Sequence, residues 1–138
     1  MIIHSEQEMI AFGEKLAEGL VAPATIELIG DIGVGKTTLT KGIARALGVS
    51  DSVTSPSFTI SKTYRSSDRP LTLTHFDFYR LPDPGLMDDQ LAESISDPET
   101  ITIVEWASSV QNTLPDNHIK ITINYNDDNT RTVKVTNP

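Results

Sequence analysis

The segment Gly30–Thr37 reads GDIGVGKT and matches the phosphate-loop pattern G-x-x-x-x-G-K-[ST]. The residues before it, Thr25–Ile29, are mostly β-branched or apolar and stop at a glycine, which predicts a short strand. The residues after it, Thr37–Leu47, carry apolar side chains at helical spacing and stop at Gly48, which predicts a helix. A strand, a glycine loop and a helix in this order are the context that a phosphate loop requires. We therefore expect a nucleoside triphosphate to bind here.

Each residue type in the loop suits a cluster of negative charge. Gly33 and Gly35 allow the backbone to turn tightly and to direct N–H groups inward, and the helix start adds partial positive charge. Lys36 is long enough to reach the β- and γ-phosphates, and Thr37 offers a hydroxyl ligand for Mg²⁺. The predicted nucleotide contacts of this segment are Asp31, Ile32, Gly33, Val34, Gly35, Lys36, Thr37 and Thr38.

Two carboxylates stand at the ends of predicted strands. Asp77 ends the segment Leu71–Asp77, and Glu105 follows the apolar run Ile101–Val104. Ligands of open α/β sheets bind at the carboxyl ends of strands, and Mg²⁺ commonly takes one or two carboxylates besides phosphate oxygens. We predict that both residues hold the metal, directly or through water, or orient the attacking water. The alternative for each is a surface carboxylate at a strand end. The predicted catalytic residues are Lys36, Asp77 and Glu105, and the predicted metal ligands are Thr37, Asp77 and Glu105.

The rest of the chain predicts one α/β domain over residues 1–138, with a central, mostly parallel sheet flanked by helices plus β-hairpins. No repeat or change of composition marks a second domain. The remaining expected elements are a strand over Met1–His4, a helix capped by Ser5 with Glu8 and closed by Pro23, a strand pair Phe58–Tyr64 and Leu71–Asp77, a short helix Leu86–Ser94, a helical segment Ala107–Thr113 and a hairpin of His118–Tyr125 with Thr132–Thr136.

Composition narrows the function classes. The chain has no cysteine, which excludes disulfides, thiolate metal sites and a cysteine nucleophile. Nothing in it has the length of a membrane span or the pattern of a secretory signal, so we expect a cytoplasmic protein. Nineteen acidic against eleven basic residues give a formal charge of −8, which argues against unaided nucleic-acid binding. A local basic patch is possible, but a solvated face is favoured for its members, Lys62, Arg65, Arg69 and Arg80.

Several polar and aromatic residues have two interpretations. Thr54–Ser57 is either an ordinary polar turn or a loop that contacts the γ-phosphate or metal. Trp106 follows Glu105, and on the residues alone core packing is favoured for it. His75 lies two residues before Asp77 on the same strand face and could orient that site, although a packed core histidine is favoured. The histidines do not have the spacing of a zinc site.

Four segments in a fixed order resemble the bacterial TsaE family, also known as YjeE. They are GDIGVGKTTL, TSPSFTI, HFDFYRL and IVEWA, and the resemblance extends over nearly the whole chain. It implies a small Mg²⁺-dependent ATPase that acts with TsaD and TsaB to form N6-threonylcarbamoyladenosine in tRNA. The partners would carry the tRNA, so this chain would meet it only through the complex.

The resemblance also implies roles for individual residues. Lys36 and Thr37 would contact phosphate and metal, Asp77 and Glu105 would be the carboxylates of Mg²⁺ binding and hydrolysis, and Thr54–Thr59 would be a switch-like segment. Trp106 becomes a neighbour of the site, and Arg131 matches an arginine of the last hairpin near the nucleotide. The chain departs from the family at Met9, close to where relatives often have a threonine near the base.

Three other functions are compatible with a phosphate loop alone. A small nucleoside or metabolite kinase is the main alternative, although the chain leaves little length for an acceptor site and an arginine-bearing lid. A GTPase is disfavoured because there is no Asn-Lys-x-Asp segment to recognise guanine. A non-catalytic domain with a relic loop would require Lys36, Thr37, Asp77 and Glu105 all to be incidental.

Overall fold

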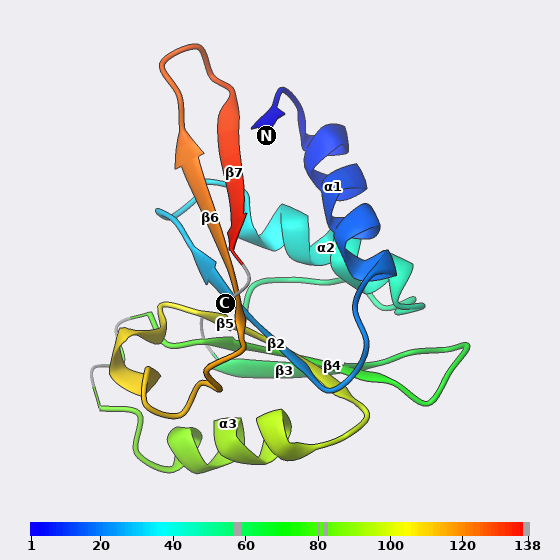
Figure 1. Ribbon diagram of the computed structural model, residues 1–138, viewed down its shortest axis with the longest axis vertical. Coiled ribbons are helices and arrows are strands. Elements are labelled where there is room, and N and C mark those ends of the chain that lie inside the picture. The colour runs from blue at the N-terminus through cyan, green and yellow to red at the C-terminus, as the bar shows by residue number, and fades with distance from the viewer. Residues whose placement is uncertain (57–58, 80, 82, 137–138) are drawn as a thin grey trace.

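Seven strands form one sheet, with two helices on one face and a third helix on the other (Figure 1). The computed structural model describes residues 1–56, 59–79, 81 and 83–136. Its strands are β1 (Ile2–Ile3), β2 (Ala24–Ile29), β3 (Ser61–Arg65), β4 (Thr72–Asp77), β5 (Thr100–Glu105), β6 (Ile119–Tyr125) and β7 (Arg131–Thr136). Its helices are α1 (Glu6–Glu18), α2 (Lys36–Ala46), α3 (Leu86–Ser96) and the 3₁₀ helix η1 (Ala107–Val110).

The sheet order is β1-β7-β6-β2-β5-β4-β3. Its centre is parallel, because β2 pairs in parallel with β5 and β6, and β5 pairs in parallel with β4. The pairs β3–β4, β6–β7 and β1–β7 are antiparallel and form the two outer parts of the sheet. The predicted α/β fold with a parallel centre and β-hairpins is confirmed. The parallel register aligns Asp77 with Glu105, so the two predicted carboxylates end neighbouring strands at one edge.

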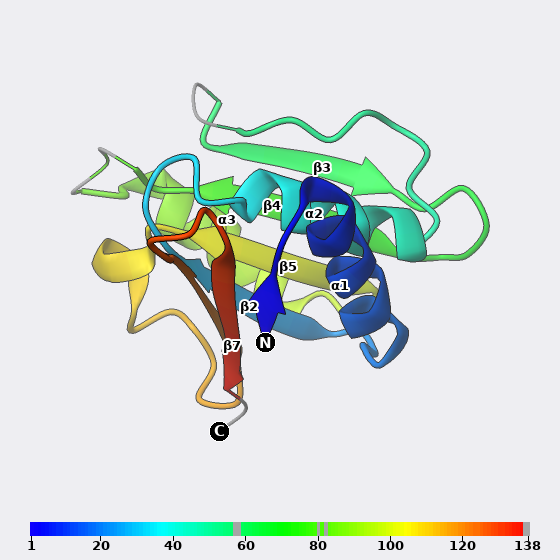
Figure 2. The ribbon, with the colours of Figure 1, turned by 90° about the horizontal axis from the view of Figure 1, so that it is seen from above.

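Alternation along the strands separates two apolar layers. Ile26 and Leu28 of β2 belong to the larger core, together with residues of α1 and α2. Val104 of β5 belongs to a smaller core that includes Leu91 of α3 and residues of η1. Figure 2 shows α1 and α2 side by side above the central strands. The larger core therefore fixes α2, the helix that follows the phosphate loop.

The backbones of α1 and α2 approach each other closely at two glycines. A Cβ atom on Gly42 would lie 2.2 Å from the carbonyl oxygen of Ile10, and one on Gly13 would lie 2.5 Å from the carbonyl oxygen of Leu39. Both distances are below the 3.0 Å that real Cβ atoms keep, so only glycine fits at this crossing. The predicted cap at the start of α1 is confirmed, because the Ser5 hydroxyl accepts a hydrogen bond from the Glu8 N–H at 3.1 Å.

Three of the differences between the observed and the predicted boundaries exceed one residue. Strand β3 begins at Ser61 rather than at residue 58, because Ile60 has a φ of 68°, which interrupts extended backbone; Phe58 itself lies outside the described residues. Helix α3 continues two residues beyond the predicted Ser94. The segment predicted as helical from Ala107 to Thr113 forms only a 3₁₀ turn. Within the described residues, no helix is long and apolar enough to cross a membrane.

Candidate functional site

The phosphate loop connects β2 to α2 and borders a cavity of about 670 Å³. Gly33 and Gly35 have φ values of 78° and 121°, a region that disfavours other residues, which explains the glycines at these two positions. The Val34 side chain is buried in the larger core and anchors the loop between them. The cavity is lined by loop residues 32, 33 and 35–38 together with Ser55, Asp77, Tyr79, Glu105 and Trp106. Of the predicted site residues, the structure brings Lys36, Thr37, Asp77 and Glu105 together here.

The Lys36 ammonium is buried and has three different contacts. Its Nζ atom donates to the carbonyl oxygen of Gly30 at 2.6 Å and lies 3.6 Å from Oε1 of Glu105. It also lies 4.1 Å from the centroid of the Trp106 ring, within the range of a cation–π contact. A buried charge requires such partners, because desolvation of an unpaired ammonium costs several kcal/mol. The loop lysine is therefore held between the phosphate loop and the end of β5.

Asp77 and Glu105 are both nearly inaccessible, at 5% and 3% exposure. The Tyr79 N–H donates to Oδ1 of Asp77 at 2.9 Å. Burial raises the pKa of Asp77 above its ordinary value, and the nearby Glu105 carboxylate acts in the same direction. The Tyr79 N–H, His75 and Lys36 oppose this shift. Two desolvated acids at one end of a cavity favour a cation between or beside them.

His75 is fully buried on β4, and its Nε2 atom forms a hydrogen bond with Oε2 of Glu105 on the neighbouring strand. The favoured prediction for His75 was a packed core histidine. The structure agrees with the burial but adds the contact to Glu105. The hydrogen bond of its ring is therefore with Glu105, which lies 30 positions later in the sequence, and not with the nearby Asp77.

Trp106 forms a wall of the cavity, so the core packing favoured from its residue type is wrong. Its side chain lines the phosphate-loop cavity and is 4.9 Å from the Tyr79 ring, between centroids. The backbone of Trp106 is left-handed, with φ 54° and ψ 51°, an uncommon conformation for a bulky residue. The turn lets the chain leave β5 and enter η1 while the indole ring stays beside Lys36.

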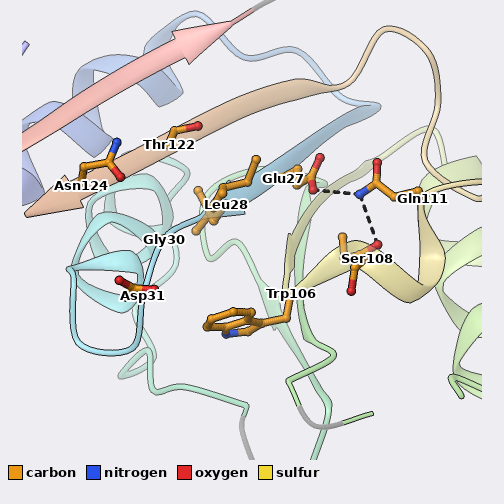
Figure 3. A pocket seen from close by; sticks show the side chains of 11 residues that line it. Glu27, Leu28, Gly30, Asp31, Trp106, Ser108, Gln111, Thr122 and Asn124 are labelled. Carbon is orange, nitrogen blue, oxygen red and sulfur yellow. Dashed lines mark hydrogen bonds between the residues drawn. The ribbon is translucent and has the colours of Figure 1, made fainter. Parts of the chain in front are cut away.

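A second cavity, of about 490 Å³, shares the Trp106 side chain with the first (Figure 3). Glu27 of β2 lines it, accepts a hydrogen bond from Gln111 Nε2 at 2.9 Å and forms a hydrogen bond with His118 Nε2 at 3.0 Å. The sequence reasoning missed this group, although Glu27 is the one charged residue inside an otherwise uncharged strand. Asp31, a predicted nucleotide contact, lines this second cavity rather than the one over the loop.

Arg131 supports the phosphate loop from the side of β7. Its Nε atom donates to the carbonyl oxygen of Val34 at 3.0 Å, and its guanidinium lies 4.6 Å from the centroid of the Tyr125 ring. The Tyr125 hydroxyl in turn donates to the carbonyl oxygen of Gly33. Arg131, Val34 and Met9 line a separate cavity of about 240 Å³ on this side of the loop. Direct contact of Arg131 with a nucleotide stays a prediction.

The other predicted features are placed as follows. Ser55 of the switch-like segment lines the phosphate-loop cavity, whereas Ser57 and Phe58 lie outside the described residues. Lys62 forms a hydrogen bond with Thr54, and the remaining described basic residues near it, Arg65 and Arg69, are exposed; Arg80 is not among the described residues. Within the described part of the chain there is no cluster of three or more His, Cys, Asp or Glu side chains that could hold a metal.

A family model described as "Threonylcarbamoyl adenosine biosynthesis protein TsaE" matches residues 3–133. The chain belongs to the TsaE family. Among its relatives, the protein named tRNA threonylcarbamoyladenosine biosynthesis protein TsaE in Haemophilus influenzae is 35% identical over 91% of this chain and 82% of its own length. The Bacillus subtilis protein of the same name is 37% identical over 88% of this chain and 75% of its own.

A solved structure supports the same assignment. The crystal structure of Bacillus subtilis YdiB superposes with a TM-score of 0.81 at 32% sequence identity, covering 99% of this chain and 83% of that one. The TsaE fold of this chain is therefore supported by both sequence and structure.

Proposed function

We propose that this TsaE-family protein binds and hydrolyses ATP as a subunit of the machinery that makes N6-threonylcarbamoyladenosine in tRNA. The names of its relatives support a role in that pathway. The observation that supports ATP hydrolysis is that Lys36, Asp77 and Glu105 line the same cavity over the phosphate loop. This geometry combines a cation for phosphate with two acids for a metal and for water.

ATP is the triphosphate that the site suits best. The cavity volume of about 670 Å³ falls in the usual range for small-molecule sites, roughly 300–1,000 Å³. The N-terminus of α2 begins at Lys36 and directs its unsatisfied N–H groups to the loop, which favours phosphate binding. The sequence lacks an Asn-Lys-x-Asp segment, so guanine recognition is disfavoured.

The residues at the cavity also fit Mg²⁺. Thr37, Asp77 and Glu105 offer only oxygen ligands, and Mg²⁺ completes its shell with phosphate oxygens and water. A site of this kind needs no cluster of three acidic or imidazole side chains. When bound, Mg²⁺ would neutralise negative charge on the phosphates. Asp77, with its raised pKa, is ionised more readily next to such a cation.

Different groups of the chain have different roles in the proposed hydrolysis. Lys36 and the N–H groups at the start of α2 stabilise charge on the transferred phosphoryl group. Glu105 and Asp77 lie at the neighbouring strand ends, where a carboxylate can hold the metal or orient the attacking water. Burial of all three side chains strengthens these electrostatic interactions, since little water competes with them.

The partners in this proposal are proteins of the TsaD and TsaB type, and tRNA is met through them. A chain with a formal charge of −8 is unsuited to binding an RNA backbone directly. A subunit that binds to RNA-binding partners does not need a positively charged surface. A cytoplasmic location is part of this proposal.

A small-molecule kinase is the second candidate, and one observation favours it. The second cavity shares Trp106 with the phosphate-loop cavity and is also lined by Gly30 and Asp31, so it offers a place for a phosphoryl acceptor. Its Glu27 carboxylate could accept hydrogen bonds from a substrate hydroxyl or amine.

Phosphate release from ATP separates the two candidates. We expect slow Mg²⁺-dependent release by the chain alone and faster release with TsaD, TsaB and tRNA. Lys36→Ala should abolish it, whereas Lys41→Ala, an exposed lysine of the same helix, should leave it unchanged. Transfer of the labelled γ-phosphate to a metabolite instead of water would refute the hydrolase proposal.

A further inference from the structure

We infer that His75 is a positioning residue, whose Nε2–H holds one oxygen of Glu105 so that the other faces Lys36 and the phosphate-loop cavity. This inference rests on the proposed ATP hydrolysis and extends it to a residue outside the cavity lining. It starts from one buried hydrogen bond between neighbouring strands.

The two oxygens of Glu105 have different surroundings. Oε2 is bonded to His75 Nε2, and Oε1 lies 3.6 Å from Lys36 Nζ. A carboxylate on a flexible glutamate side chain can rotate about its last bond, so a fixed partner on one oxygen also fixes the direction of the other. His75 is well suited to this, because its ring is fully buried and its strand pairs in register with β5.

The hydrogen bonds identify which ring nitrogen carries the proton. A carboxylate oxygen only accepts, so Nε2 is the donor to Glu105. His75 Nδ1 is buried and has no hydrogen-bond partner among the residues that the structure describes. The contact with Glu105 therefore places a proton on Nε2.

The unsatisfied Nδ1 distinguishes this role from ordinary packing. An apolar side chain would fill this fully buried site without leaving a polar atom unpaired, and an unpaired polar atom costs about 1–3 kcal/mol. The imidazole is compensated only on its Nε2 side, by the bond to Glu105. Local violations of packing rules of this kind are expected at functional sites.

Two substitutions at His75 distinguish a role of Nε2 from a role of Nδ1. The amide nitrogen of His75→Gln can occupy the place of Nε2, whereas that of His75→Asn falls near the place of Nδ1 and cannot reach Glu105. We expect His75→Gln to keep kcat within about threefold of the wild type. His75→Asn should lower kcat by roughly 10–100-fold, the usual effect of removing a group that orients a site residue. The KM for ATP should change little in both, because neither touches the phosphate loop.

The assay is phosphate release by the full chain with TsaD and TsaB, accompanied by thermal melting of each variant. Both variants lose the aromatic ring, so similar melting temperatures with different kcat values would assign the effect to the Glu105 contact. Equal losses of kcat in the two variants would overturn the inference.

A second measurement needs no substitution and no nucleotide. Nitrogen-15 NMR of histidine-labelled wild-type protein should show His75 with a proton on Nε2. The opposite tautomer would overturn the inference even if neither variant folds. Absence of hydrolysis by the wild type would instead refute the proposed function, and the NMR result would still decide the His75–Glu105 contact.

Discussion

The crossing of α1 and α2 predicts a strong destabilisation by the substitution Gly42→Ala. The new Cβ atom would lie 2.2 Å from the Ile10 carbonyl oxygen, so the helices must separate by about 0.8 Å to reach the 3.0 Å that such atoms keep. Overpacking of this kind costs up to about 3 kcal/mol, and backbone atoms cannot rotate away as a side chain can. The higher helix propensity of alanine offsets about 1 kcal/mol of this destabilisation. The net loss should be about 2 kcal/mol.

Thermal unfolding without nucleotide measures this loss. For a chain of 138 residues, 2 kcal/mol corresponds to a melting temperature lower by about 8 °C. The matched control is Gly19→Ala, where φ is −92° and the nearest atom to the new Cβ is 3.7 Å away. This control should melt within about 3 °C of the wild type, or slightly higher, because alanine reduces the entropy of the unfolded chain.

The two glycine variants also test how the helix crossing affects the site. Because α2 begins at Lys36, a displaced α2 should also weaken ATP binding in the Gly42→Ala variant. If Gly42→Ala melted like Gly19→Ala, the close approach of the two backbones would be wrong, and with it the account of how α2 is held behind the loop.

Two further predictions concern the site. Asp77→Asn should abolish hydrolysis but raise the free energy of unfolding of the nucleotide-free protein, since a neutral amide avoids the burial of a charge and its Oδ1 can still accept from the Tyr79 N–H. Because folding raises the pKa of Asp77, the wild-type protein loses stability as the pH rises from the unfolded-state pKa of this group through its folded-state pKa. The difference in free energy of unfolding between the variant and the wild type should therefore shrink in acid. A difference that does not depend on pH would contradict this reasoning. Arg131→Ala removes the hydrogen bond to the Val34 carbonyl oxygen, which contributes about 1 kcal/mol. We expect ATP binding to weaken roughly fivefold, with kcat unchanged. A Kd measured by calorimetry that equals the wild-type value would show that the phosphate loop does not depend on Arg131.

The phosphate loop and the acids at the strand ends could be predicted from the sequence because both depend on local patterns. The glycine spacing, the strand before it and the helix after it lie within one continuous segment. Asp77 and Glu105 could be paired in advance because parallel strands end at the same edge, and the observed register confirms this reasoning. Whether they contact metal or nucleotide stays a prediction.

The contacts across the sheet could not be predicted, because they depend on strand order. The Glu27–His118 pair joins residues 91 positions apart, and it exists because β6 pairs with β2. The His75–Glu105 bond likewise requires β4 and β5 to be neighbours. Trp106 is a different case. On its residue type alone core packing is favoured, and only the family resemblance makes it a neighbour of the site, where the structure has it lining both cavities.

Trp106 is the only tryptophan of the chain, and it touches the lysine of the phosphate loop. All indole fluorescence of the protein therefore originates from one ring, placed between two cavities and beside one cation. An ammonium over an indole perturbs its excited state, so movement of Lys36 would change the emission without any attached dye. The protein thus contains an intrinsic optical probe at its candidate active site, and it can be followed while the partner proteins bind.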